Sequence, residues 1–212
     1  MHNSFRCPLC SAEDLENITV KIVEWTFFKC LQCGLHFKSL SDRPSSSKEK
    51  IRYEEHNNDP EDQRYLNYLR KAADPLIEML NEGDKGLDFG CGPGPASKKI
   101  FTNQSMDYYD PFFFEDRSLL EKKYNFLFCT EAVEHFYEPK KTWEQMFNLL
   151  HDDGILMVMT NILYEDIDFS SWWYIKDPTH VVLYTPESLN FIERTYTWKK
   201  VFEGKNLIAF KK

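Results

Sequence analysis

The stretch Gly86-Leu-Asp-Phe-Gly-Cys-Gly-Pro-Gly-Pro-Ala-Ser97 carries the strongest fold signal in the chain. Its apolar start, Leu87 to Phe89, predicts a strand, and Ala96 to Phe101 predicts the start of a helix. Three glycines stand between them at alternate positions: Gly90, Gly92 and Gly94. Glycine permits positive φ and lets the backbone approach a ligand closely. A strand, a glycine turn and a helix N-terminus together predict a cradle for a nucleotide-like ligand.

Two common glycine signatures do not fit this turn. A dinucleotide fingerprint reads G-x-G-x-x-G or G-x-G-x-x-A, but the sixth position counted from Gly90 is Pro95. A P-loop would need Gly-Lys followed by Ser or Thr, which the sequence lacks here. What remains is D-x-G-x-G-x-G, from Asp88 to Gly94. A tight turn without a ligand is the alternative, although a plain turn rarely needs three glycines and a preceding acid.

This pattern resembles motif I of the class I S-adenosylmethionine-dependent methyltransferases. The resemblance covers roughly Tyr65 to the C-terminus. It implies an α/β fold with a Rossmann-like, mostly parallel sheet, helices on both faces and an antiparallel edge. It also implies S-adenosylmethionine as the cofactor, held by Asp88 and the three glycines. The acid suits the cationic end of that ligand, and glycine backbone suits close packing on it.

The second strand of such a sheet is expected at residues 105–110. Asp110 then stands at the strand end, where an acid receives the ribose hydroxyls in this fold. Asp107 is the competing acid, but it lies in the middle of the strand. Residues 111–123 offer a helix and little strand, so the third-strand region is expected to be reduced and the usual adenine contact to change. Phe112 is either a stacking face for adenine or ordinary core.

The next strand, Tyr124 to Cys129, leads into Thr-Glu-Ala-Val-Glu-His-Phe136 and resembles motif IV. Thr130 and Glu131 at its tip are expected to face the ligand crevice. His135 follows one turn later. It is either a general base, with an unperturbed pKa near neutrality, or a structural histidine that holds the turn.

Residues 161–184 are expected to choose the substrate, because insertions after the later strands form the substrate pocket in this family. Trp172, Trp173 and Tyr184 are the candidate substrate contacts. His180 is the leading candidate for a base or a substrate hydrogen bond. The alternative is that the tryptophans pack against another part of the chain and His180 caps a turn.

Two C-x-x-C pairs near the N-terminus, Cys7/Cys10 and Cys30/Cys33, have the spacing of a zinc ribbon. Four thiolates complete a tetrahedral Zn²⁺ and leave no open position, so a structural ion is expected. The β-branched and aromatic residues between the pairs predict the strands of a small sheet. His36 lies outside the thiolate set and is expected at the surface.

These signals predict three regions: a zinc ribbon at 1–40, a linker and lid segment at 41–64, and a methyltransferase domain at 65–212. In related enzymes the segment before motif I covers the ligand, which would bring Tyr53 and His56 near the methyl donor; the alternative is that Tyr53 packs and His56 is exposed. The helix that follows is expected to split at Pro75, as the first residue of a second helix, and to end at Gly83.

Composition narrows the range of partners that the protein is expected to bind. The 212 residues carry a net charge of -8, with a pI of about 5.3. An acidic chain does not bind DNA by surface charge, so no DNA partner is expected. Since no apolar run reaches the ~20 residues that span a bilayer, the sequence predicts a cytoplasmic protein without a membrane partner.

The expected function is transfer of a methyl group from S-adenosylmethionine to an acceptor. A small molecule is favoured by the acidic charge and the aromatic content, while a protein or an RNA also fits. One alternative is a catalytically inactive relative that acts as a zinc-ribbon module binding protein or RNA. A nicotinamide oxidoreductase is disfavoured by the failed dinucleotide fingerprint.

Overall fold

The computed structural model describes residues 5–20, 22–55 and 58–212 and contains two sheets. The larger sheet has the order β5-β4-β6-β7-β10-β9. Its members are β4 (Lys85–Phe89), β5 (Ser105–Tyr109), β6 (Tyr124–Thr130), β7 (Leu150–Met159), β9 (Lys199–Gly204) and β10 (Leu207–Lys211). The first four neighbours pair in parallel, and β10 and β9 add an antiparallel edge. The predicted α/β class is therefore confirmed.

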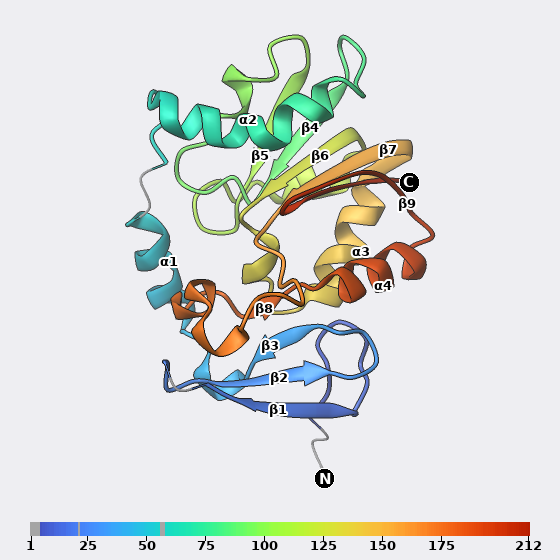
Figure 1. Ribbon diagram of the computed structural model, residues 1–212. Coiled ribbons are helices and arrows are strands. Elements are labelled where there is room, and N and C mark those ends of the chain that lie inside the picture. The colour runs from blue at the N-terminus through green and yellow to red at the C-terminus, as the bar shows by residue number, and fades with distance from the viewer. Residues whose placement is uncertain (1–4, 21, 56–57) are drawn as a thin grey trace.

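Helices cover both faces of this sheet (Figure 1). On one face lies α2 (Gln63–Ile77), which buries Leu69, Ala72 and Leu76 against a cluster that includes Phe126 and Met157. The other face carries α3 (Pro139–Leu149) and α4 (Pro186–Thr195). Thr185 caps α4 by accepting from the amide of Ser188, and Pro186 follows at the first helical position.

Three local expectations were wrong. Helix α2 continues through Pro75, which sits in the last turn, two residues before the helix ends. Gly83 consequently does not cap that helix; its φ of 82° serves a later turn, where its amide donates to the carbonyl of Asn103. The helix expected after the glycine turn is one 3₁₀ turn, Ser97–Lys99.

Residues 111–123 contain only the 3₁₀ turn Arg117–Glu121 and an isolated bridge between Asp110 and Phe114. The chain thus passes from β5 to β6 without a third strand, as the sequence predicted. Since β5 is left at the sheet edge, the loop after it is free to fold back over the tip of β4.

The smaller sheet is antiparallel, with the order β1-β2-β3-β8. It joins β1 (Leu15–Thr19), β2 (Thr26–Cys30) and β3 (His36–Lys38) to β8 (Val182–Leu183). The register of the last pair places His36 opposite Leu183 and Phe37 opposite Val182. The N-terminal region therefore shares a sheet with the segment that follows β7, and the two regions stack in Figure 1.

This shared sheet corrects the expectation for His36. The residue is 8% exposed, and its ring centroid lies 5.2 Å from that of Phe169. Burial lowers the pKa of His36 to about 4, so the ring is neutral at neutral pH. His36 is a packed core residue of the smaller sheet.

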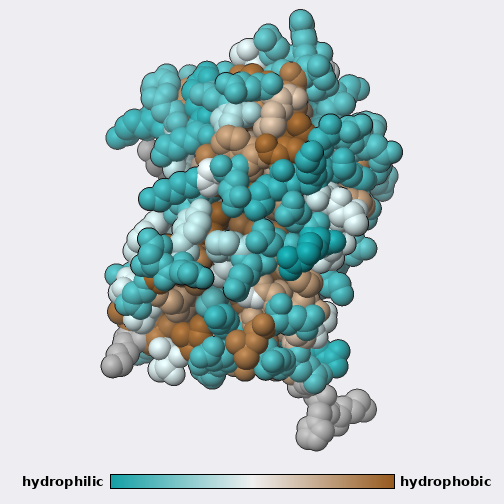
Figure 2. All heavy atoms as spheres, turned by 45° about the vertical axis from the view of Figure 1, so that its right-hand side comes forward, coloured by the Kyte–Doolittle hydropathy of each residue, from teal (hydrophilic) through white to brown (hydrophobic). Residues whose placement is uncertain are grey.

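One further helix, α1 (Ser46–Glu54), runs along the side of the molecule between the smaller sheet and α2 (Figure 1). Hydrophilic side chains cover most of the face drawn in Figure 2, with smaller apolar areas between them. No helix among the described residues combines the length and apolar character that crossing a bilayer requires.

Candidate active site

A cavity of about 600 Å³ lies at the carboxyl ends of β4, β5 and β6. This volume is within the ~300–1,000 Å³ typical of small-molecule sites. Parallel α/β sheets bind ligands at this edge, because the strand tips and the loops that follow them converge there. Helix α1 contributes to the wall through Glu49 and Tyr53. The cavity therefore joins the predicted cofactor turn to the predicted lid.

Asp88 forms the floor beneath the glycine turn. It is 5% exposed and accepts a hydrogen bond of 2.6 Å from the Ser97 hydroxyl. Burial raises the pKa of Asp88 to about 7, with the nearby Asp110 adding to the effect. A buried carboxyl of this kind gains from a cationic ligand, which would restore its ionised form.

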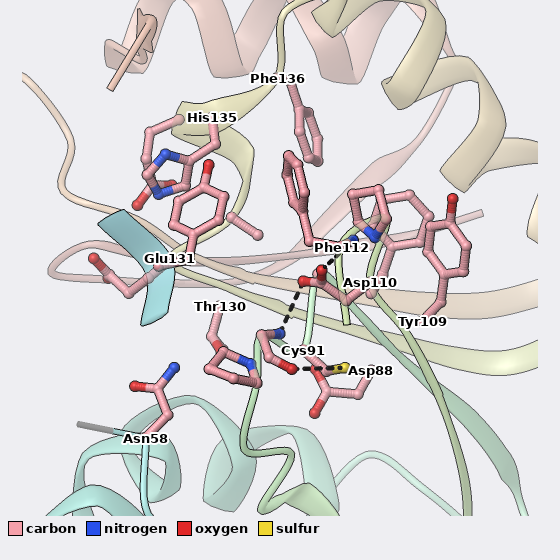
Figure 3. A pocket seen from close by; sticks show the side chains of 18 of the residues that line it. Asn58, Asp88, Cys91, Tyr109, Asp110, Phe112, Thr130, Glu131, His135 and Phe136 are labelled. Carbon is pink, nitrogen blue, oxygen red and sulfur yellow. Dashed lines mark hydrogen bonds between the residues drawn. The ribbon is translucent and has the colours of Figure 1, made fainter. Parts of the chain in front are cut away.

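The glycine turn is fastened to the loop after β5 by Asp110. Gly92 has a φ of 65°, and its amide donates to Oδ2 of Asp110 at 2.9 Å. The other carboxylate oxygen accepts from the amides of Phe112 at 2.8 Å and Phe113 at 3.2 Å. Asp110 is among the lining residues (Figure 3). The residue predicted to bind ribose thus also holds the glycine turn against the loop after β5.

Gly94 was predicted to contact the cofactor, but its observed role is to admit another backbone segment. It does not line the cavity, but a Cβ at this position would lie 1.8 Å from the backbone oxygen of Asn58. The segment before α2 therefore crosses directly over the turn, and only glycine admits that approach. The side chain of Asn58 in turn lines the cavity (Figure 3).

The tip of β6 supplies Thr130 and Glu131, both of which line the cavity as expected. Glu131 has a φ of 48°, an uncommon conformation for a residue that is not glycine, and its amide donates to the carbonyl of Met159 at 2.7 Å. Burial and the neighbouring Glu134 raise the pKa of Glu131 to about 8. Strain of this kind is concentrated at functional sites.

Two histidines meet at the far end of the cavity. Their ring centroids lie 5.0 Å apart, and both residues line the cavity. His135 Nδ1 contacts the carbonyl of Thr179 at 2.9 Å, and His180 Nδ1 contacts that of Tyr174 at 2.7 Å. Burial lowers the pKa of His135 to about 4 and that of His180 to about 3. Both rings are neutral at neutral pH.

A family model described as "Methyltransferase domain" matches residues 61–196. The chain belongs to this family. Its match covers every wall of the cavity except α1 and Asn58, so the strand tips, the glycine turn and both histidines lie within the methyltransferase domain.

Solved structures show the same fold at low identity. A Burkholderia thailandensis 1,6-didemethyltoxoflavin N1-methyltransferase, bound to its substrate and S-adenosylhomocysteine, is 11% identical with a TM-score of 0.53, and the match covers 93% of this chain and 99% of that one. A candidate methyltransferase from Bacillus halodurans is 13% identical with a TM-score of 0.51, covering 62% of this chain and 71% of that one.

A candidate sarcosine dimethylglycine methyltransferase from Galdieria sulphuraria is 17% identical with a TM-score of 0.48. The match covers 65% of this chain and 63% of that one, so the chain spans less than two thirds of that protein's length. No curated protein sequence matches the chain.

Helix α1, in the segment predicted to be a lid, lies against the cavity through Glu49 and Tyr53. The Tyr53 hydroxyl donates to Glu49 at 2.6 Å, and the Tyr53 ring lies edge-on to His135 at 5.1 Å and to Phe112 at 5.6 Å. Tyr53 thus lines the cavity, its role as part of a lid stays a prediction, and His56 lies outside the described residues. Phe112, predicted as either stacking face or core, lines the cavity.

The three predicted substrate contacts lie elsewhere. Trp172 is 8% exposed and packs with Val20 and Phe27 of the N-terminal region. Trp173 is 63% exposed. The Tyr184 hydroxyl is buried and accepts from the indole of Trp143 at 2.9 Å. None of the three lines the cavity, because the 161–184 segment turns toward the smaller sheet after β7.

Several cavity residues escaped the sequence prediction. Tyr68 on α2 and Glu134 beside His135 both line the cavity, as does Glu49, which is 7% exposed. The only available signal was the Glu-His pair in the motif IV segment. Tyr68 and Glu49 belong to helices whose pattern indicated ordinary packing or linker.

The four N-terminal cysteines come together as their spacing predicted. Cys7 Sγ lies 3.6 Å from Cys33 Sγ, and Cys10 Sγ lies 3.4 Å from Cys30 Sγ. All four sulfur atoms lie within 4.8 Å of one another. Sulfur atoms at ~2.3 Å from a tetrahedral Zn²⁺ would stand about 3.8 Å apart, so the donor set and its spacing fit that ion.

A buried lysine connects this cysteine region to the histidine loop. Lys38 is 0% exposed, and its Nζ donates to the carbonyl of Pro178 at 2.8 Å. Its amide donates to the carbonyl of Val181, the residue after His180. Burial lowers the pKa of Lys38 to about 7. The smaller sheet thereby supports the loop that presents His180 to the cavity.

Proposed function

We propose that this protein transfers a methyl group from S-adenosylmethionine to a small-molecule acceptor. The observation that carries the proposal is the D-x-G-x-G-x-G turn on one wall of a cavity at the tips of β4 to β6. Membership of the methyltransferase family and the likeness to a fold seen with S-adenosylhomocysteine support it. The proposed cofactor residues are Asp88, Gly90, Gly92, Asp110, Thr130 and Glu131, while Gly94 shapes the turn from outside the cavity.

The sulfonium of the methyl donor is cationic, and the acidic lining of the cavity favours a cationic ligand. Its described lining residues include six acids and neither lysine nor arginine. Asp88 and Asp110 lie on the side of the glycine turn, whereas Glu131 and His135 stand across the pocket (Figure 3). This division supports a methyl donor that lies over β4 and reaches Glu131 at the tip of β6, with the acceptor at the histidine end.

The chemistry needs little beyond alignment, because the methyl group is already activated by the sulfonium. The acceptor's lone pair forms the new bond to carbon as the carbon–sulfur bond breaks, and S-adenosylhomocysteine leaves. Proximity and in-line orientation carry much of the rate enhancement. His135 and His180 hold the hydroxyl or amino group of the acceptor and are the groups placed to receive its proton.

A small acceptor is favoured by how the cavity is covered. Helix α1 lies over it, and Tyr53 contacts both His135 and Phe112 from that side. The substrate bound in the Burkholderia thailandensis structure is likewise a small heterocycle, 1,6-didemethyltoxoflavin. A folded RNA or a protein acceptor would reach the histidines only after α1 had moved away from the cavity.

For the N-terminal region we propose a structural Zn²⁺ bound by Cys7, Cys10, Cys30 and Cys33. The four sulfur atoms complete the coordination, so the ion has no open position for chemistry. The proposed regions of the chain are the ribbon at 1–40, the linker and lid at 41–64 and the methyltransferase domain at 65–212. Pairing of β3 with β8 makes the ribbon a support for the catalytic domain rather than an independent module.

The test is to follow radioactive methyl groups from labelled S-adenosylmethionine into a cell extract separated by size. The proposal predicts that the zinc-loaded protein labels the low-molecular-mass fraction. Gly92→Arg, which places a bulky side chain in the positive-φ turn, is the inactive control. Label found only in protein or RNA would overturn the small-molecule acceptor while retaining the methyl transfer.

A further inference from the structure

Three potential metal ligands meet at the histidine end of the cavity, remote in sequence from the cysteine cluster. Glu134, His135 and His180 each offer one ligand atom, and these atoms lie within 4.8 Å of one another. All three residues line the cavity. The first two belong to the 3₁₀ turn Val133–His135, and the third precedes β8. The pairing of Val181 N–H with the Glu134 carbonyl holds the two segments together.

Both imidazoles are oriented as ligands rather than as surface side chains. The partner of each Nδ1 is a backbone carbonyl, which only accepts, so Nδ1 carries the hydrogen and Nε2 carries the lone pair. Metal-binding histidines are held by the same kind of second hydrogen bond, which fixes the tautomer and the ring orientation.

The carboxylate of Glu134 is oriented in the same way. It is fully buried and accepts from the hydroxyls of Thr160 at 2.9 Å and Tyr174 at 2.5 Å. An ionised carboxylate has about four lone-pair positions, so two hydroxyl donors leave room for another partner. Glu131 lies beside it, and no lysine or arginine stands among the cavity residues that the structure describes. A buried carboxylate that stays ionised needs a cationic partner or a metal ion.

We propose that Glu134, His135 and His180 bind one divalent transition-metal ion through a carboxylate oxygen and the two Nε2 atoms. Two imidazoles and one carboxylate are the donor set of catalytic Zn²⁺ sites and of non-haem Fe²⁺ sites, and both keep coordination positions open. Zn²⁺ is also the ion proposed for the ribbon. The open positions face the cavity.

The ion would give the histidine pair a defined role toward an acceptor. A bound hydroxyl or amino group would be held and polarised by the metal, so with the ion present the imidazoles act on it through the metal, and its proton passes to water rather than to a histidine. This role rests on the proposed methyl transfer, whereas metal binding itself does not. The two claims therefore fail separately, since the metal is counted without any methyl donor.

Metal content after equilibrium dialysis against buffered Zn²⁺ tests the proposal on the full chain. Wild type is expected to hold two equivalents of Zn²⁺, and the His135→Ala/His180→Ala double variant one. His151→Ala removes an exposed histidine on β7 and is the matched control, expected to keep two. Circular dichroism and a thermal melt establish that each variant is folded.

Co²⁺ provides a second readout on wild type alone, should the double variant not fold. Four thiolates give intense thiolate-to-metal absorption, whereas a histidine and carboxylate site adds weaker bands without it. One equivalent of Zn²⁺ in wild type, or cobalt bands from the thiolate site only, overturns the proposal. So does a second equivalent that survives the double substitution. The cavity acids would then serve the ammonium group of an acceptor instead.

Discussion

Replacing Asp110 tests whether one carboxylate shapes the cofactor loop. Its oxygens accept from three backbone amides, those of Gly92, Phe112 and Phe113, at 2.9, 2.8 and 3.2 Å. Leaving one buried donor without a partner costs about 1–3 kcal/mol. Asp110→Asn keeps one oxygen but turns an amide donor toward Gly92, so it should cost about 2 kcal/mol in the free energy of unfolding. Asp110→Ala removes both oxygens and should cost about 4 kcal/mol.

Urea unfolding followed by circular dichroism measures both variants. Glu115→Gln is the control, because Glu115 is exposed on the same loop and its ion pair is with Arg117, which is also exposed. It should stay within about 0.5 kcal/mol of wild type. Affinity for S-adenosylmethionine should fall at least about tenfold in the alanine variant, or 1.4 kcal/mol. An alanine variant as stable as the control would refute the reasoning, because the three amides would then not need the carboxylate.

Three further outcomes are expected. Gly94→Ala pushes a Cβ against the Asn58 carbonyl, 1.8 Å away; the donor affinity should fall about tenfold or more, and calorimetry checks it. Lys38→Met leaves the Pro178 carbonyl without its donor and should lower the free energy of unfolding by about 1–3 kcal/mol; an unchanged urea midpoint would contradict the support role. Since burial raises the pKa of Asp88 to about 7 and that of Glu131 to about 8, their ionised forms are gained as pH rises. Affinity for the cationic donor should therefore rise from about pH 6 to about pH 9. A calorimetric affinity that does not change with pH would show that neither carboxylate contributes to donor binding.

The parts that the sequence predicted were those encoded in short, local patterns. The glycine turn with Asp88, the acids at the tips of β5 and β6, and the reduced third strand depend on residues within a few positions of one another. The cysteine spacing is similarly local, although its two pairs are brought together by β1 and β2. These patterns sufficed for the α/β class and for one wall of the cavity.

The missed features depend on contacts between distant segments. Pairing of β3 with β8 buries His36 and turns the 161–184 segment toward the ribbon, which removes Trp172 and Tyr184 from the cavity. No periodicity in either segment indicates such a pairing. Glu49 enters the cavity only because α1 folds back across the strand tips. The aromatic residues of the 161–184 segment, after β7, indicated a substrate pocket. In the structure they pack the smaller sheet against the larger one.

The central claim is that the cavity above β4 binds S-adenosylmethionine, and calorimetric titration of folded, zinc-loaded protein tests it most directly. S-adenosylmethionine and S-adenosylhomocysteine should both bind, with dissociation constants on the order of micromolar, while NADH should not. Binding should be lost in Gly92→Arg, whose side chain would enter a turn with a φ of 65°. Folded protein that binds neither adenosyl ligand would contradict the account.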